Sequence, residues 1–194
     1  MAEVNAFKDL RSIQKIKDYL YKKENKRDYV IFVVGINVGL RASDLLALKA
    51  KDVYSSNGKD IHREIALVEK KTSKKRVIRL NDASVDALNV LCDEYKFEPE
   101  DCLFKSRKGN GPISVRSLNR LVKLWCRENE IKGNFGSHSL RKTFGYHTYM
   151  NHIENPRILH ILQKLFGHSS ELTTLRYIGI ENEEIKELYD DLNL

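Results

Sequence analysis

Residues 61–80 read IHREIALVEKKTSKKRVIRL, and this stretch sets the fold class. Two runs rich in β-branched residues, REIALVE and RVIRL, flank the polar bend KKTSKK, which is the pattern of a β-hairpin. It is the one sheet that the sequence predicts. The bend would carry Lys70, Lys71, Lys74 and Lys75 outward, where they could enter a DNA groove, deliver a proton or simply protect a sheet edge.

Helical periodicity occurs on both sides of this hairpin. Before it, apolar residues recur every three or four positions from Phe7 to Leu20, and the run YVIFVVGINVGL predicts a buried helix ending near Gly39. Ser43 is a candidate N-cap for a short third helix. After the hairpin, helical patterns cover about Asp82–Tyr95, Ser114–Asn129, Ser137–Met150, Pro156–Phe166 and Glu181–Leu192. We predict one mainly α domain over residues 1–194 with a small antiparallel β-sheet, an α+β fold.

The composition restricts the class of protein. The 194 residues include 34 Lys and Arg against 27 Asp and Glu, a formal net charge of +7, which favours a polyanionic partner such as nucleic acid. The longest apolar run, 29–40, is shorter than the roughly 18 residues that a membrane helix needs. The N-terminus lacks a signal-peptide pattern, and Cys92, Cys102 and Cys126 cannot all pair within the chain. We therefore expect a soluble, cytoplasmic protein with no membrane partner.

Arg41 lies in the motif GLRASDL, between the expected helix end at Gly39 and the Ser43 cap. Its guanidinium would leave a turn beside a helix N-terminus, where backbone N–H groups and the helix dipole assist anion binding. The alternative is a surface arginine that ends a buried helix.

His138 and Arg141 lie in the motif HSLRKTFGYH, three residues apart on one helix face. That face presents an imidazole, which titrates near neutral pH, beside a guanidinium suited to phosphate oxygens. A hydrogen-bonded structural histidine is the alternative interpretation.

The motif FGHSSELTTLRYI places a turn before a candidate nucleophile. Gly167 would end a helix, His168 would follow in the turn, and Tyr177 comes nine residues later on a helix capped within the Ser/Thr-rich stretch. A tyrosine can attack phosphorus, but with a pKa near 10 it needs cations or a base beside it.

Together these residues favour phosphoryl transfer without a metal. Two-metal nucleases need clustered carboxylates, and Asp44 and Glu171 are the acidic residues within these motifs. The cysteines are too far apart, and too far from histidine, for a zinc site. We predict no metal and no cofactor.

The four motifs, in this order, resemble the catalytic domain of the tyrosine recombinases, the phage integrase family. The resemblance runs from about Arg27 to Ile178 and implies the fold of that domain. It assigns catalytic roles to Arg41, Lys71, His138, Arg141, His168 and Tyr177, with Lys70 or Lys74 in place of Lys71 if the hairpin register differs. Lys142 and Gly179 depart from the pattern, in which histidine is common at both positions.

The resemblance implies a site-specific recombinase that works through a 3′-phosphotyrosine intermediate, without metal or ATP. The two arginines would bracket the scissile phosphate and His168 would donate a hydrogen bond to it. His138 would take the proton of Tyr177, and Lys71 would protonate the leaving 5′ oxygen. The implied partners are double-stranded DNA and three further copies of the chain, a tetramer on paired sites formed from monomers. The residues expected to contact DNA are Lys70, Lys74, Lys75 and Lys142, and nucleoid association follows from this.

Three alternatives remain open at this point. Since only about 40 residues precede Arg41, the chain resembles either an isolated catalytic domain, without the usual core-binding domain, or the short fimbrial-switch recombinases. In the C-terminal segment 181–194, an apolar stripe of Ile185, Leu188 and Leu192 predicts a helix that packs on its own domain or is exchanged between subunits. A DNA-binding regulator and a type IB topoisomerase are the rival functions.

Overall fold

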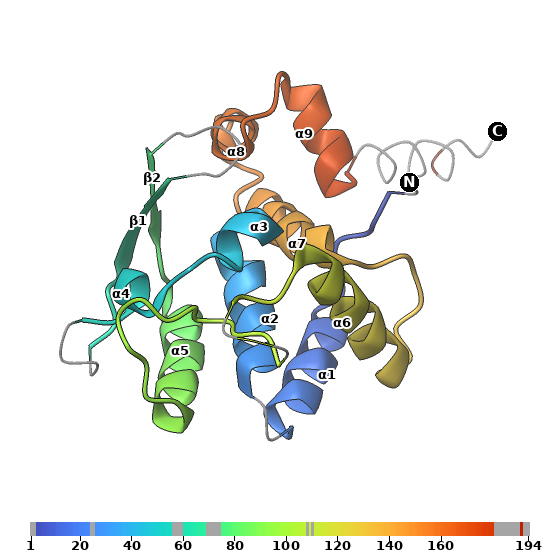
Figure 1. Ribbon diagram of the computed structural model, residues 1–194. Helices are drawn as coiled ribbons and strands as arrows, with labels where there is room; N and C mark the ends of the chain where they lie inside the picture. Colours follow the sequence, from blue (N-terminus) through green and yellow to red (C-terminus); the bar gives the residue numbers. More distant parts are fainter. Residues whose placement is uncertain are drawn as a thin grey trace.

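The computed structural model describes residues 3–23, 26–55, 60–68, 75–107, 109, 111–180 and 191 (Figure 1). It confirms a mostly helical chain with one two-stranded antiparallel sheet. The elements are α1 (Leu10–Tyr21), α2 (Lys26–Val38), α3 (Ala42–Leu45), α4 (Ala50–Val53), β1 (Glu64–Val68), β2 (Lys75–Arg79), α5 (Asp82–Glu94), α6 (Val115–Glu128), α7 (Ser137–Asn151), α8 (Ile158–Phe166) and α9 (Glu171–Ile178). None of the described helices has the length and apolarity needed to cross a membrane.

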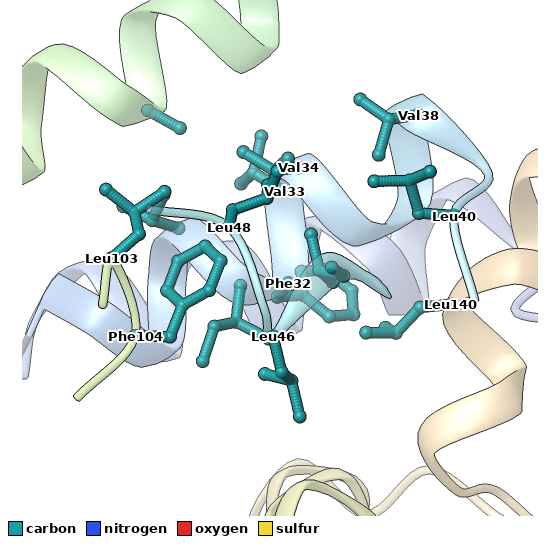
Figure 2. Packing of buried hydrophobic residues seen from close by; sticks show 14 of the residues in the cluster. Phe32, Val33, Val34, Val38, Leu40, Leu46, Leu48, Leu103, Phe104 and Leu140 are labelled. Atoms are coloured by element: carbon teal, nitrogen blue, oxygen red, sulfur yellow. The ribbon is translucent and has the colours of Figure 1, made fainter. Parts of the chain in front are cut away.

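Helix α2 is the centre of the core. It is apolar on nearly every side, and α1, α5 and α7 pack around it (Figure 1). Figure 2 shows Phe32, Val33 and Val34 of α2 packed with side chains from the α3 region, from the loop after α5 and from α7. Burying a side chain of this size contributes roughly 1.5–3 kcal/mol relative to leaving it in water. The predicted buried helix is therefore the helix on which the others are assembled.

Three helix beginnings differ from the sequence prediction. Helix α1 begins at Leu10 rather than near Phe7, because the carboxylate of Asp9 accepts the backbone N–H groups of Arg11 and Ser12. Helix α3 is capped by Arg41 and not by Ser43. Helix α8 begins at Ile158 after Arg157, so that Pro156 precedes the helix instead of lying in its first turn. In each case the apolar pattern was correct and the first residue of the helix was misplaced, because periodicity does not mark where a helix begins.

The hairpin lies where the sequence places it. Strands β1 and β2 are antiparallel, with Ile65 opposite Ile78 and Val68 opposite Lys75. The two isoleucines are buried against the rest of the protein. The guanidinium of Arg76 donates to the carbonyl of Leu165 in α8 at 3.1 Å. The start of β2 is therefore held at the last turn of α8 (Figure 1).

Helices α8 and α9 form a second, smaller apolar cluster beyond α7. Its buried members are Ile158, Leu162, Phe166, Ile178 and Ile180. Helix α7 joins the two clusters, since Leu140 is buried in the main core and Phe144 packs against the smaller one. A Cβ at Gly145 would lie 2.7–2.8 Å from side-chain atoms of Ile178 and Phe166, so only glycine allows this close approach of α9 and α8. Arg141, also on α7, lies at the boundary between the two clusters.

Candidate active site

Two arginines converge on one backbone carbonyl at the boundary between the clusters. Arg41 donates from Nη2 to the carbonyl oxygen of Phe166 at 3.4 Å, and Arg141 donates from Nη2 to the same oxygen at 3.0 Å. Phe166 is the last residue of α8, where the helix dipole leaves partial negative charge on the carbonyl groups. The structure thus brings together two predicted residues that are 100 positions apart in the sequence.

The turn before α3 fixes the guanidinium of Arg141. Gly39 has φ +61°, and a Cβ there would lie 2.4 Å from the ring of Phe144, so its conformation and its surroundings both require glycine. Its carbonyl accepts Nη1 of Arg141 at 2.7 Å. Arg141 is 4% exposed and its guanidinium lies over the Phe166 ring, 4.5 Å from the centroid. Arg141 therefore has a packing role as well as a charge.

His168 follows the left-handed Gly167 that ends α8. Its Nδ1 lies 3.1 Å from the hydroxyl oxygen of Thr174, which is fully buried and in turn donates to the carbonyl of Ser170. Burial, with the positive charges of Arg141 and Arg41, lowers the pKa of His168. The imidazole is thus oriented by α9 and is predominantly neutral at pH 7.

Tyr177 lies on α9 with its ring against His168, the two centroids 4.9 Å apart, and against Phe166 at 5.4 Å. Burial raises the pKa of the phenol, whereas the charge of Arg141, a hydrogen bond with Arg141 and the charge of Arg41 lower it. The cations that would bind an anion therefore also oppose the cost of ionising this tyrosine.

His138 and Lys142 lie on either side of Arg141 along α7. His138 is exposed at the N-terminal turn, and its Nδ1 lies 3.5 Å from the Ser137 hydroxyl. Partial burial, followed by the charges of Arg141 and Lys142, lowers the pKa of its ring. Lys142, which we expected to contact DNA, is buried, and its ammonium binds the carboxylate of Glu3. The structure therefore places Lys142 inside the protein and not on the basic surface.

The hairpin lysines are mostly outside the described residues. This applies to Lys70, Lys71 and Lys74, and the C-terminal helix expected at 181–194 also lies outside them apart from Asp191. Lys75 is described and is exposed at the start of β2. Arg76 beside it binds Leu165, one residue before the carbonyl shared by the two arginines. The start of β2 is therefore held close to the site.

Sequence reasoning missed several groups that build this site. Arg76 gave no signal because a basic residue next to a lysine-rich bend resembles one more surface charge. Thr174 was recognised as part of a capping stretch, although its hydroxyl orients His168. The Phe166 carbonyl carries no side-chain signature. Residue types alone therefore could not indicate that this carbonyl accepts both guanidinium groups.

Helix α6 adds a row of cations beside the site. Arg116, Arg120, Lys123 and Arg127 are all exposed, and their spacing puts them on one helix face. Among the described residues, the first three have no carboxylate partner. The side-chain oxygen of Asn119, on the same turn as Arg120, accepts the backbone N–H of Ser137 at the start of α7. The row therefore passes close to His138.

The arrangement suits a phosphodiester. Two guanidinium groups and an imidazole lie around a phenol. Arginine pairs grip phosphate oxygens, and a tyrosine beside them can attack phosphorus. Within the described ranges, no group of three His, Cys, Asp or Glu residues could hold a metal ion.

Comparison with known sequences gives a consistent answer. The phage integrase family matches residues 6–184. The probable integrase/recombinase YoeC of Bacillus subtilis is 36% identical over 189 residues, 96% of this chain and 95% of that protein. Tyrosine recombinase XerC of Caldanaerobacter subterraneus is 32% identical over 84% of this chain but only 44% of its own length. The chain thus spans nearly all of one relative and about half of the other.

Comparison with solved structures supports the same fold. The XerA recombinase superposes with a TM-score of 0.72 at 20% identity, covering 100% of this chain and 66% of that one. The XerH recombinase, solved bound to a palindromic difH substrate, gives 0.71 at 20% identity and is covered over 53% of its length. The catalytic domain of bacteriophage HP1 integrase gives 0.57 at 19% identity, with 96% of that domain covered.

Proposed function

The chain belongs to the phage integrase family of tyrosine-type site-specific recombinases, and we propose that it cleaves and rejoins double-stranded DNA through a covalent bond to Tyr177. The observation that supports this most directly is the convergence of Arg41 and Arg141 on the Phe166 carbonyl beside His168 and Tyr177. A scissile phosphate bound by the two guanidinium groups would be within reach of the phenol.

The proposed reaction follows from these positions. The phenolic oxygen of Tyr177 forms a bond to phosphorus, the bond from phosphorus to the 5′ oxygen breaks, and a 3′-phosphotyrosine remains. The arginines stabilise the charge that develops on the non-bridging oxygens, and His168 donates a further hydrogen bond from Nε2 in its protonated form, which the bound phosphate anion favours. His138 accepts the proton of Tyr177. A 5′-hydroxyl of a second strand can reverse the attack, because the ester is retained in the intermediate.

The leaving 5′ oxygen needs a proton, and we assign its donor to the hairpin. Lys71 is the proposed donor, with Lys70 or Lys74 as the alternatives. The support is the bond from Arg76 to Leu165, which holds the start of β2 at the last turn of α8. Lys75, exposed at that position, is proposed to contact the DNA backbone together with Lys70 and Lys74.

The proposed DNA surface extends over α6. Its row of exposed cations begins beside His138 and runs along the helix, so that it could follow a phosphate backbone leading away from the cleavage point. Strand exchange needs two paired sites, which we propose are held by a tetramer assembled from monomers on DNA. Localisation at the nucleoid follows from this function.

The covalent step provides the decisive experiment. Nicked duplexes cut from the DNA that flanks its gene would trap the intermediate, because the short 5′ fragment beyond the nick diffuses away. We expect Tyr177→Phe to abolish the SDS-stable adduct and to retain DNA binding, while Tyr149→Phe, a partly buried tyrosine of the same cluster, forms the adduct normally. The reactions would be run in EDTA.

Two results would contradict the proposal. An adduct formed by Tyr177→Phe would assign the nucleophile to another residue. Relaxation of a supercoiled plasmid without recombination between two sites would instead favour a topoisomerase.

A further inference from the structure

Lys142 is a buried charge to which the reaction proposed above assigns no task. Its side chain is 6% exposed, and it follows Arg141 on α7. Burying an ammonium group is costly unless the group is paired. Its Nζ lies 2.5 Å from a carboxylate oxygen of Glu3 and 5.0 Å from the centroid of the Tyr177 ring. The cation is therefore held between a carboxylate and the face of the nucleophile.

The carboxylate comes from an N-terminal strap, residues 3–9, which is fixed at several points. The Asn134 side chain donates to the Glu3 carbonyl, and the Asn5 N–H donates to the Asn134 carbonyl, both at 2.7 Å. Further along, the Phe7 N–H donates to the hydroxyl of Thr143 on α7.

The strap also reaches the end of the nucleophile helix. The ammonium of Lys8 donates to the carbonyl of Gly179, the C-cap of α9, at 2.9 Å. The ring of Phe7 stacks on Phe135 with centroids 4.4 Å apart. Glu3 is therefore delivered to one place by a segment anchored to α7 and α9. Its contact with Lys142 is therefore supported by the hydrogen bonds that hold the strap in place.

Glu3, Lys142 and Tyr177 share one cavity. Its volume is about 500 Å³, and its lining also includes Lys132 and Arg176. The Lys142 side chain is 6% exposed whereas that of Glu3 is 67% exposed, so water screens the ammonium less than the carboxylate and Lys142 acts on the tyrosine at close range.

We propose that Lys142 is a positioning residue for the nucleophile: held by Glu3, its ammonium steadies the ring of Tyr177 and stabilises the phenolate formed on attack. A cation over an aromatic face is attracted to the ring, and the attraction increases when negative charge spreads into it. The inference rests on the proposed function only in naming Tyr177 as the nucleophile.

The two partners of the ion pair should act on Tyr177 in opposite directions. We expect Lys142, 5.0 Å from the ring centroid, to favour the phenolate, whereas the negative charge of Glu3 raises the pKa of the phenol, in addition to the larger effect of burial. The other charged or titratable groups that act on the phenol or contact its ring are Arg141, Arg41 and His168, and all three remain in each variant below.

The ionisation of Tyr177 can be measured without DNA. The whole chain would be labelled with 3-fluorotyrosine and titrated by ¹⁹F NMR, and the Tyr177 signal would be assigned by its loss in Tyr177→Phe. Fluorination makes the phenols more acidic, so that Tyr177 ionises while lysines are still charged. The result is independent of whether the protein recombines DNA.

We expect Lys142→Met to raise the pKa of Tyr177 by about one pH unit, and Glu3→Gln to lower it. Lys142→Arg, which keeps the charge, should stay near the parent value. Lys132→Met, which removes a lysine from the same cavity, is the matched control and should leave the pKa of Tyr177 unchanged. If Lys142→Met does not fold, Lys142→Gln replaces it.

An ion pair between Lys142 and Glu3 that only stabilised the fold would not change the titration of Tyr177 in this way. The inference is overturned if Lys142→Met leaves the titration of Tyr177 unchanged, or if both partners' variants move it in the same direction. On nicked DNA, Lys142→Met should form the adduct more slowly at pH 7 and recover toward the parent rate at higher pH. A rate loss that is equal at every pH would also overturn it.

Discussion

Arg141 combines two tasks that usually belong to different residues. Its guanidinium donates to the carbonyl groups of Gly39 and Phe166, and it covers the Phe166 ring, so it stabilises the contact between the two apolar clusters. The same group is the one that we propose binds the scissile phosphate. Activity lost on replacing Arg141 is therefore informative only when the stability of the variant has been measured.

His168 gives a pH dependence whose sign can be worked out. Its pKa is lowered in the folded protein by burial and by Arg141 and Arg41, whereas the unfolded chain has the ordinary value near 6.5. Between the two values the unfolded chain binds more protons, so the free energy of unfolding falls as the pH drops from 7 to 5. We expect His168→Gln to lose less stability over this range than the parent protein, as measured by urea unfolding at both pH values.

A second histidine variant serves as the control. His152→Gln replaces an exposed residue at the end of α7 and should follow the parent protein. Equal losses for the parent protein and His168→Gln would contradict the assigned role of burial and of the two arginines.

At this scale the sequence indicated candidate site residues better than it indicated how they are held. Arg41, Arg141, His168 and Tyr177 were found from motif spacing, and the structure brings them together. The burial of Lys142 was missed, because its partner Glu3 lies 139 positions away and no local pattern links them. Long-range ion pairs of this kind are set by tertiary packing, which periodicity does not report.

The last turn of α8 is the element that organises the site. Its carbonyl groups at Leu165 and Phe166 accept guanidinium groups from β2, from the α3 cap and from α7. The sequence predicted each of these elements, since hydrophobic periodicity is local. It could not predict that three of them would meet at one helix end, because the acceptors are backbone atoms common to every residue.

This turn gives a prediction for the hairpin. Arg76→Met should release the start of β2 from Leu165 and slow DNA cleavage, while the free energy of unfolding changes little because the side chain is only partly buried. A substrate with a 5′-bridging phosphorothiolate needs no proton donor, so it should restore much of the rate. Single-turnover adduct formation on both substrates would measure this.

Arg79→Met is the matched control, since Arg79 lies on the same strand but is exposed. It should cleave both substrates at the parent rate. An Arg76→Met protein that is equally slow on both substrates would show that the arginine does not act through the proton donor.

Over the whole molecule, positive charge is unevenly distributed. The net charge of +7 includes the row on α6, whose first three cations have no carboxylate partner among the described residues. Other lysines are paired with a carboxylate, such as Lys49 and Lys51, which share Glu100 and keep a net charge of +1 with it. The row on α6 therefore adds exposed positive charge that a polyanion could bind.

This distribution predicts how binding responds to salt. Lys123→Gln should weaken binding to a duplex of arbitrary sequence and reduce the slope of log affinity against log salt by about 0.9, the contribution of one phosphate contact. Lys96→Gln, an exposed lysine after α5, should change neither quantity. Fluorescence anisotropy at several KCl concentrations would test both. An unchanged slope for Lys123→Gln would remove α6 from the proposed DNA surface.

The shared carbonyl of Phe166 has a consequence for how this protein can change over generations. Its acceptor atom belongs to the main chain, so no codon substitution at that position can delete it, whereas alanine there would remove the buried ring that lies under Arg141. The side chains around it can drift while the meeting point of the two guanidinium groups persists. Mutational sensitivity at position 166 would therefore report the loss of the buried ring, and the acceptor at the centre of the site would remain invisible to it.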